Sequence, residues 1–244
     1  MKTIYKEILA ICFLLAFWYG VSLLVDSNVV PPPHRVFCNF LNEGPLLFAR
    51  HFSASSLRIL SALFLSVALG VPAGILLGRS KTLDRLTSSV IYIVYPVPKI
   101  VFLPIVIILL GLGNSSKIFI IFFIVFFQIL VTTKDAAKSI GDEEILSVRS
   151  LGGSSFDVFR HVIVPAILPG IFTSIRIAIG TCVAVLFFVE SFATEEGLGY
   201  LIIDAWSKFD YVLMYNAIIA MGALGLALYV AVDRLQKYLC PWME

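Results

Sequence analysis

Six stretches of this 244-residue chain are almost wholly apolar, and about 20 apolar residues suffice to cross the hydrocarbon core of a bilayer. Lipid offers the backbone no hydrogen-bond partner, so each stretch must form a helix that satisfies its own amides. We therefore expect an all-α polytopic membrane protein with six transmembrane helices. The stretches are Ile8–Val25, Leu57–Gly78, Ser89–Leu112, Ile118–Thr132 (the shortest), Pro165–Val189 and Val212–Val232.

The composition excludes a large soluble domain as the alternative. Apolar residues make up 59% of the chain and charged residues 14%, whereas soluble domains average roughly 45–50% and about 25%. The mean hydropathy of +0.98 leaves too few polar side chains to cover a water-facing surface. Lipid is therefore the expected solvent, and we expect no nucleic-acid partner.

The first apolar stretch could be mistaken for a signal peptide, because Lys2 and Lys6 precede it. Its length is about that of a spanning helix, and it is followed by Asp26-Ser27-Asn28 and prolines rather than by a small-residue cleavage site. We expect a helix that is retained.

The Lys and Arg residues predict the orientation of the helices. If the N-terminus is cytoplasmic, the inner set is Lys2, Lys6, Arg79, Lys81, Arg85, Lys134, Lys138, Arg149, Arg160, Arg234 and Lys237. The outer set is then Arg35, Arg50, Arg58, Lys117 and Lys208. Because cytoplasmic loops carry the excess of Lys and Arg, this bias predicts that both termini are cytoplasmic, which agrees with an even number of helices.

Three connecting segments are long enough to have a role of their own. Asp26–Ser56 and the acidic segment Glu190–Tyr211 are expected outside, and Lys134–Val164 inside. Within the inner segment, Asp135–Leu151 is predicted to form an amphipathic helix that Gly152-Gly153 ends, since glycine readily adopts the left-handed conformation.

A capping-box pattern, Ser154-Ser155-Phe156-Asp157, predicts the start of a second helix in the inner segment. The spacing of Phe156, Phe159 and Ile163 would place them on one face of that helix. Pro165 and Pro169 are expected to mark the entry to the fifth spanning helix. The apolar face needs a partner, which is either the membrane surface or a groove on a cytoplasmic protein.

At this segment the sequence resembles the permeases of ATP-binding-cassette (ABC) importers, the binding-protein-dependent inner-membrane component family. That family carries the signature E-A-A-x3-G-x9-I-x-L-P. The aligned residues are Leu146-Ser147-Val148-x3-Gly152-x9-Val162-Ile163-Val164-Pro165. The glycine, the spacing and the last proline match, whereas Leu146 stands at the position of the glutamate that usually makes a salt bridge with the ATPase.

Further motifs resemble one branch of the family, which serves nitrate, sulfonates such as taurine, and bicarbonate, with relatives for riboflavin and pyrimidine precursors of thiamine. Together they extend the resemblance over nearly the whole chain, but they do not identify the cargo. They are Val30-Pro31-Pro32-Pro33, Pro96-Val-Pro-Lys99-Ile-Val-Phe-Leu-Pro104, Gly111-Leu-Gly113-Asn-Ser-Ser-Lys117, Leu168-Pro169-Gly170-Ile171 and Glu190…Glu196-Gly197-Leu198-Gly199-Tyr200-Leu201.

The resemblance implies a type I ABC-importer permease fold made of one transmembrane domain over residues 1–244, with a core at about 57–233 and an ATPase-coupling loop at 134–165. It also implies a second permease chain, identical or similar, two cytoplasmic ATPases that bind the ATP, and an external solute-binding protein. The expected location is the cell membrane. The residues implied in ATPase coupling are Leu146, Ser147, Val148, Gly152, Phe156, Phe159 and Pro165.

Four residues are candidates for the translocation path. Lys99 and Arg176 lie within apolar stretches, where an uncompensated charge costs about 2.5–3.5 kcal/mol, so each must snorkel, pair or face a polar pathway. Pro96, with its neighbouring prolines, should kink or break the third helix, either to line the path or only to aid packing. Glu190 lies at the end of the fifth stretch.

Two other classes of protein are alternatives. A membrane enzyme would need paired carboxylates or metal ligands at a common depth, and an ion-coupled secondary transporter would show internal repeats and intramembrane carboxylates. The sequence shows neither pattern, and it has no phosphate-cradling G-x-x-x-x-G-K-S/T loop. We therefore expect no enzymatic activity and no cofactor in this chain.

Overall fold

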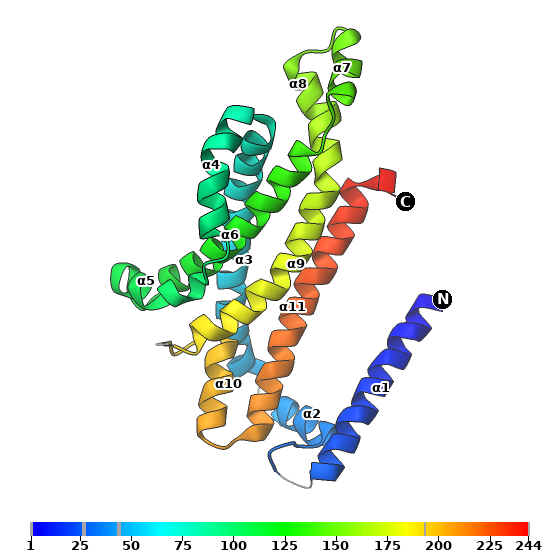
Figure 1. Cartoon of the computed structure of the whole chain (residues 1–244). Coiled ribbons are helices and arrows are strands. Elements are labelled where there is room, and N and C mark those ends of the chain that lie inside the picture. Colours follow the sequence, from blue (N-terminus) through cyan, green and yellow to red (C-terminus); the bar gives the residue numbers. More distant parts are fainter. Residues whose placement is uncertain (1, 26–27, 43–44, 193, 244) are drawn as a thin grey trace. The chain divides into compact units, whose positions relative to one another are not determined.

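The computed structural model describes residues 2–25, 28–42, 45–192 and 194–243. Asp26 and Ser27, at the predicted start of the first outer segment, lie outside the described residues, as do both end residues of the predicted domain. Every regular element in the described part of the chain is helical, which confirms the all-α prediction (Figure 1). The elements are α1 Lys2–Val25, α2 Pro33–Asn42, α3 Pro45–Arg79, α4 Lys81–Val94, η1 Lys99–Phe102, α5 Leu103–Leu110, α6 Asn114–Lys138, α7 Asp142–Ser150, α8 Ser155–Val158, η2 Phe159–Ile163, α9 Val164–Glu190, α10 Leu198–Ser207, α11 Tyr211–Leu239 and η3 Pro241–Met243.

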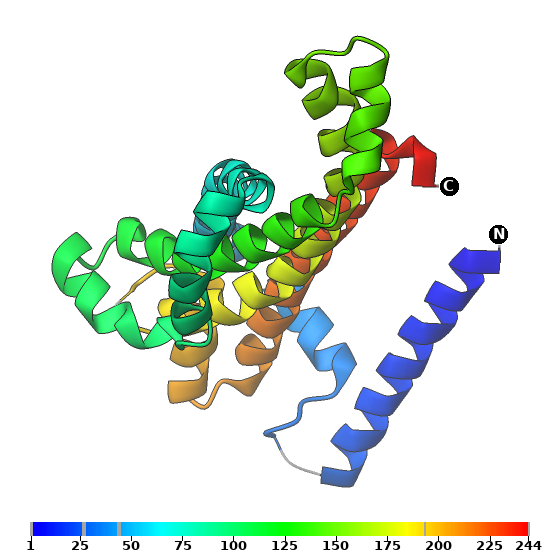
Figure 2. The same cartoon turned by 45° about the horizontal axis from the view of Figure 1, so that its top comes forward.

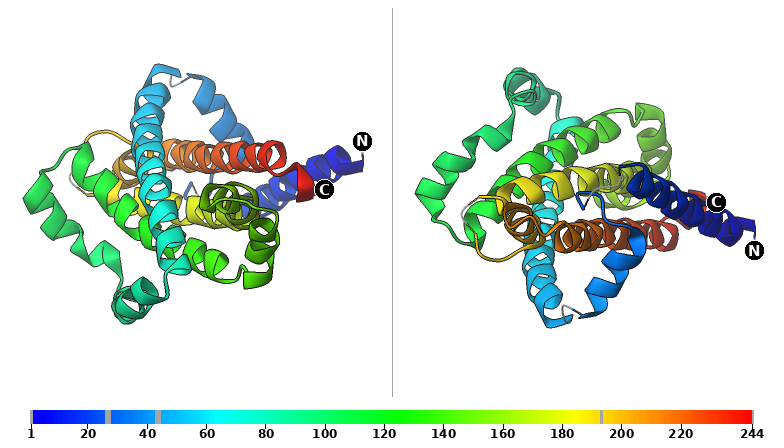
Figure 3. Two further views of the ribbon diagram at one scale, coloured as in Figure 1. Left: turned by 90° about the horizontal axis from the view of Figure 1, so that it is seen from above. Right: turned by 90° about the horizontal axis from the view of Figure 1, so that it is seen from below.

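Five helical runs among the described residues are long and apolar enough to span a membrane. They are Ile8–Val25, Leu47–Arg79, Asn114–Lys138, Ser155–Glu190 and Tyr211–Leu239. A sixth candidate is the pair Lys81–Val94 and Lys99–Leu110, whose two parts are bent by 79°. The predicted kink or break in the third helix is confirmed. In both views of Figure 3, α4 is seen almost end-on, whereas the segment after it runs across the page.

The chain divides into two compact units. The first unit comprises the residues up to Ser55 together with Glu190–Ala223, and the second comprises Ser56–Val189 together with the residues from Leu224 onward. The boundaries fall within α3 and α11 and at the last residue of α9.

The first unit contains most of the two segments predicted to be external. The first of these is not a simple loop, because it holds α2 and the beginning of α3, which starts at Pro45 rather than near Leu57. Pro33 and Pro45 each stand at a first helical position, where the fixed φ of proline suits a helix and its missing N–H is not needed. Side-chain contacts then connect the elements, including stacking of Trp18 on Tyr215 with ring centroids 5.6 Å apart.

The second unit is built on close contact between α3 and α6. Three glycines of α3 face α6, and a Cβ added at Gly78 would lie 2.5 Å from the carbonyl oxygen of Lys134. At Gly74 the nearest atoms would be Thr133 Cβ at 2.7 Å and the Leu130 carbonyl oxygen at 2.8 Å. Larger residues at these two positions would separate the helices, since the obstructing groups are mainly backbone.

The inner segment differs from the prediction at both ends. Instead of one amphipathic helix over Asp135–Leu151, α6 continues to Lys138 and a separate helix, α7, begins at Asp142. Three acidic residues fill the first turn of α7, where the helix dipole favours negative charge. The apolar pattern by itself does not reveal this restart.

The fifth spanning helix begins earlier than predicted, because the helical run starts at Ser155 rather than at Pro165. A π-helical turn, Phe159–Ile163, joins α8 to α9, and the amide of Val164 bonds to the carbonyl of Phe159. Pro165 has no amide hydrogen to donate, so a change of hydrogen-bond register beside it lets the helix pass through without an interruption.

Candidate functional site

A short helical hairpin, α7 with α8, projects from the N-terminal end of α9 in the second unit (Figures 1 and 2). Its turn is a Schellman motif. The amide of Gly153 bonds to the carbonyl of Val148 and that of Gly152 to Arg149, both at 3.0 Å. Gly152 has a φ of +84°, which confirms the predicted left-handed glycine. The turn therefore fixes the direction in which α8 leaves α7.

The predicted capping box at the start of α8 is also present. Asp157 N donates to Ser154 Oγ at 3.3 Å, and Ser154 N donates to the Asp157 carboxylate at 2.8 Å. Two of the amides that lack a helical partner at this end are thereby paired. Ser147 is satisfied within α7, since its hydroxyl donates to the carbonyl of Glu143 at 2.9 Å. The hairpin is thus an ordered surface rather than a flexible tether.

Four large apolar side chains at this hairpin are exposed. Leu151 is 89% exposed, Phe156 65% and Phe159 40%, and Leu146 is exposed as well. Phe156, Phe159 and Ile163 were predicted to lie on one face of the helix. This prediction is wrong for Ile163, which is buried while the two phenylalanines are exposed. The π-helical turn changes the angular spacing after Phe159, so the i, i+7 relation of an α-helix no longer applies. Val148 and Pro165 are half-buried.

The second feature is the break between α4 and η1. Pro96 and Pro98 lie in it, and neither can donate a helical hydrogen bond. The Lys99 side chain folds back so that Nζ donates to the carbonyl oxygens of Tyr95 at 2.9 Å and Val94 at 3.3 Å. The Nζ atom also lies 4.9 Å from the ring centroid of Phe127 on α6. Lys99 is therefore buried and paired with the chain itself.

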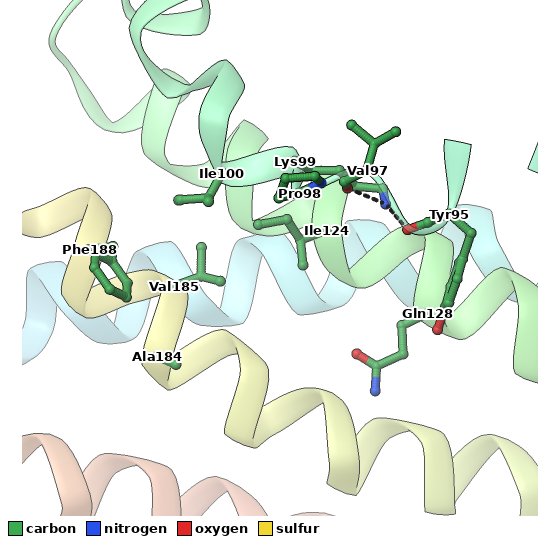
Figure 4. Close-up of a pocket in the computed structure, with 10 residues that line it drawn as sticks. All are labelled: Tyr95, Val97, Pro98, Lys99, Ile100, Ile124, Gln128, Ala184, Val185 and Phe188. Carbon is green, nitrogen blue, oxygen red and sulfur yellow. Dashed lines mark hydrogen bonds between the residues drawn. The ribbon is translucent and has the colours of Figure 1, made fainter. Parts of the chain in front are cut away.

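A cavity of about 390 Å³ lies beside this break (Figure 4). Tyr95 and Gln128 lie at one end of it, and Val185 and Phe188 at the other. The full lining is Tyr95, Val97, Pro98, Lys99, Ile100, Ile124, Gln128, Ala184, Val185 and Phe188. A mostly apolar wall with a few polar groups is typical of small-molecule sites.

Only one of the four predicted path residues, Lys99, lines this cavity. Pro96 lies in the same break. Arg176 on α9 instead pairs with α11, where its guanidinium donates to Gln236 and, at 3.4 Å, to Asp233. Sequence reasoning missed Gln128, although a single amide within the apolar stretch Ile118–Thr132 could have drawn attention to it.

Glu190 belongs to the first unit, where its buried carboxylate holds the start of α10. It accepts a hydrogen bond from Ser55 Oγ at 2.9 Å and one from the amide of Gly199 at 2.8 Å. The Ser55 hydroxyl in turn accepts from the amide of Leu198 at 2.8 Å. The carboxylate thus sits at a helix N-terminus, which favours negative charge.

Residues 70–244 match the model of the family described as the binding-protein-dependent transport system inner membrane component. The chain belongs to this family. It is therefore the membrane-spanning permease subunit of an ABC importer and a multi-pass inner-membrane protein. The chain is not an enzyme, because in these importers the ATPase is a separate subunit. Membership also implies ATPase and binding-protein partners and a dimeric arrangement.

Curated relatives match almost the full length of the permease. The taurine transport system permease protein TauC of Escherichia coli is 34% identical over 94% of this chain and 86% of its own length. The aliphatic sulfonates transport permease protein SsuC of the same organism is 28% identical, over 94% and 88%. The formylaminopyrimidine transport permease protein ThiX of Halalkalibacterium halodurans is 25% identical, over 100% and 99%.

A solved structure supports the fold. The permease resembles a chain of the MetNI methionine ABC transporter in an inward-facing conformation, with a TM-score of 0.68 and 20% sequence identity over 80% of this chain and 96% of that one. This similarity confirms the expected type I importer permease fold.

Proposed function

We propose that this permease imports a small sulfonate. Residues 1–244 act as one transmembrane domain, which pairs with an identical copy. Each copy binds one of two cytoplasmic ATPases through the coupling loop, residues 134–165. The observation that carries the proposal is the ordered hairpin of α7 and α8, which exposes Leu146, Leu151, Phe156 and, at its end, Phe159. An apolar surface held in a fixed shape is characteristic of a docking element.

We expect the hairpin to bind its partner in the way that an amphipathic helix binds in an apolar groove. Leu151, Phe156 and Phe159 supply the apolar anchors, and the Schellman turn and capping box hold them in place. Leu146 replaces the family's glutamate, so apolar burial takes the place of an ion pair. Gly152 and Pro165 then serve the geometry of the turn and of the entry to α9.

The proposed orientation follows from the docking. Because the ATPases are cytoplasmic, the hairpin must be cytoplasmic too, and the excess of Lys and Arg on the same side agrees with this. Both termini are then cytoplasmic. Reporter fusions after Gly141 and after Glu244 should both give a cytoplasmic signal, and an external signal from either would refute the orientation.

We propose that the cavity beside the α4–η1 break forms part of the translocation path. Gln128 offers it an amide, whereas the ammonium of Lys99 already donates to backbone carbonyls. Pro96 contributes by keeping the break, Arg176 pairs with α11, and Glu190 holds α10. The sulfonate class rests on the taurine and aliphatic sulfonate permeases among the relatives.

The test is transport in proteoliposomes that contain the permease with its co-encoded ATPase. Uptake of radiolabelled taurine should require ATP on the ATPase side and the co-encoded binding protein on the other, and unlabelled aliphatic sulfonates should compete. Uptake driven by an ion gradient without ATP would refute the importer mechanism. Uptake of a formylaminopyrimidine but not of taurine would refute only the sulfonate assignment.

A further inference from the structure

A half-buried ion-pair cluster joins α4 to α6 in the second unit, and one of its members, Lys138, is 61% exposed. The two oxygens of Asp84 on α4 each take one lysine of α6, with Lys134 Nζ at 2.6 Å from Oδ1 and Lys138 Nζ at 2.7 Å from Oδ2. The Asp84 side chain is 16% exposed and that of Lys134 10%. Ser88 completes the cluster, since its hydroxyl donates to Asp84 at 2.6 Å and accepts from Lys134 at 2.8 Å.

The same end of α6 is also held by α3. Arg79, the last residue of α3, donates to the carbonyl oxygens of Ala137 at 3.3 Å and Ile140 at 3.1 Å, which lie where α6 ends. Gly78 allows the α3 backbone to touch that of Lys134. The final turn of α6 is therefore attached to both α3 and α4, and a displacement of this turn acts on both helices.

The cluster lies close in the chain to the start of the hairpin, and α4 leads from it to the proline break. Three residues after Lys138 the chain reaches Gly141, and α7 of the hairpin begins. In the other direction, α4 runs as one helix from Lys81 to Val94, so a displacement at Asp84 is carried about 15 Å to the proline break. Lys99 and Pro98, which follow, line the cavity.

We infer that Asp84 is a positioning residue that couples movement of the α7–α8 hairpin to the α4–η1 break and the cavity beside it. The inference rests on the proposed function of the hairpin and the cavity. A hairpin pulled by the ATPase moves the end of α6. The Asp84 cluster passes this movement to α4, and α4 repositions Val97, Pro98 and Lys99 at the wall of the cavity. In this arrangement α6 and α4 each move as a rigid helix, and the carboxylate of Asp84 is the contact that links them.

The test compares wild type, Asp84→Asn and a charge-reversed pair, Asp84→Lys with Lys134→Asp, in reconstituted importers. Asn keeps the size of the side chain but loses its charge. We expect Asp84→Asn to lower taurine uptake at least about tenfold, while ATPase binding and ATP hydrolysis stay within about twofold and the melting temperature stays close to that of wild type. The reversed pair should recover part of the uptake. Asp204→Asn is the matched control, because it breaks the exposed Lys208–Asp204 pair on α10.

A second readout follows α4 directly. Tyr92 is exposed on α4, and a fluorophore on Tyr92→Cys in a cysteine-free background should report an ATP-dependent change that Asp84→Asn abolishes. Normal uptake in Asp84→Asn would overturn the inference. A parallel loss of uptake, ATPase binding and thermal stability would also overturn it, because the cluster would then only stabilise the fold. A wild-type importer without ATP-dependent uptake would instead refute the proposed function.

Discussion

The ammonium of Lys99 lies 2.9 Å from the backbone carbonyl oxygen of Tyr95, the C-cap residue of α4. The last carbonyls of a helix have no partner within it, and in an apolar environment each needs one. The charge and the unpaired backbone therefore satisfy each other. A lysine that the sequence places inside an apolar stretch proves to cap the helix broken by Pro96 and Pro98.

Replacing Lys99 with methionine should weaken this break. The change removes hydrogen bonds from a charged donor, each worth about 1.5–3 kcal/mol, and leaves buried carbonyls unpaired. We expect a lower melting temperature in detergent and a lower maximal uptake rate, with KM for taurine within about twofold of wild type. A large rise in KM with unchanged stability would mean that Lys99 contacts the cargo. Lys99→Arg, which keeps the charge, should be milder.

Replacing Glu190 with glutamine should loosen the start of α10. Oε1 of Glu190 accepts from Ser55, and Oε2 accepts from both Ser55 and Gly199, so a glutamine, which keeps only one acceptor oxygen, puts an NH2 group at one of these two positions. One mispaired buried group costs about 1–3 kcal/mol. Thermal unfolding and amide exchange over α10 are the measurements. Glu195→Gln is the control, since Glu195 is exposed, and equal effects of the two changes would contradict this account.

Gly152→Val should impair ATPase coupling through the backbone alone. A Cβ at Gly152 would meet nothing within 4 Å, so the cost comes from its positive φ, about 1–2 kcal/mol, and is greatest for a β-branched residue. We expect weaker ATPase association in pull-down and slower uptake. Gly152→Asn is the matched control, because asparagine tolerates this conformation. If Gly152→Val transports normally, the hairpin is not the coupling element.

The double change Phe156→Ala with Phe159→Ala should release the ATPase while the permease still inserts in the membrane. Burying one phenylalanine contributes about 1.5–3 kcal/mol, whereas an exposed ion pair contributes about 0–1 kcal/mol. The complex should therefore weaken at least about tenfold, and raising salt should affect the wild-type complex little. Phe192→Ala, at an exposed phenylalanine outside the hairpin, is the control.

The opposite pattern would contradict apolar docking. A complex that survives the loss of both phenylalanines but dissociates in moderate salt would indicate docking by charge. The exposed rings would then rest on the membrane surface, the alternative that the sequence left open.

Local features of this permease could be read from the sequence because they depend on neighbours along the chain. Apolar length predicted the spanning helices, and prolines 96 and 98 predicted the break. Gly152 predicted the left-handed turn, and Ser154 with Asp157 predicted the capping box. Some local predictions were wrong. A new helix begins at Asp142 within the predicted single helix, and the π-helical turn before Pro165 both carries the helix past that proline and turns Ile163 away from Phe156.

The sequence by itself determined that this chain is an all-α membrane protein, because apolar length and composition decide the solvent before any helix meets another. Only the tertiary structure decided the partners of its buried polar groups. Asp84 meets Lys134 across 50 residues of chain, and Glu190 meets Ser55 across 135. Such pairs form because particular helix faces come together, and no local pattern records which faces those are. A charge removed from water requires a partner, and the packing of the helices selects it.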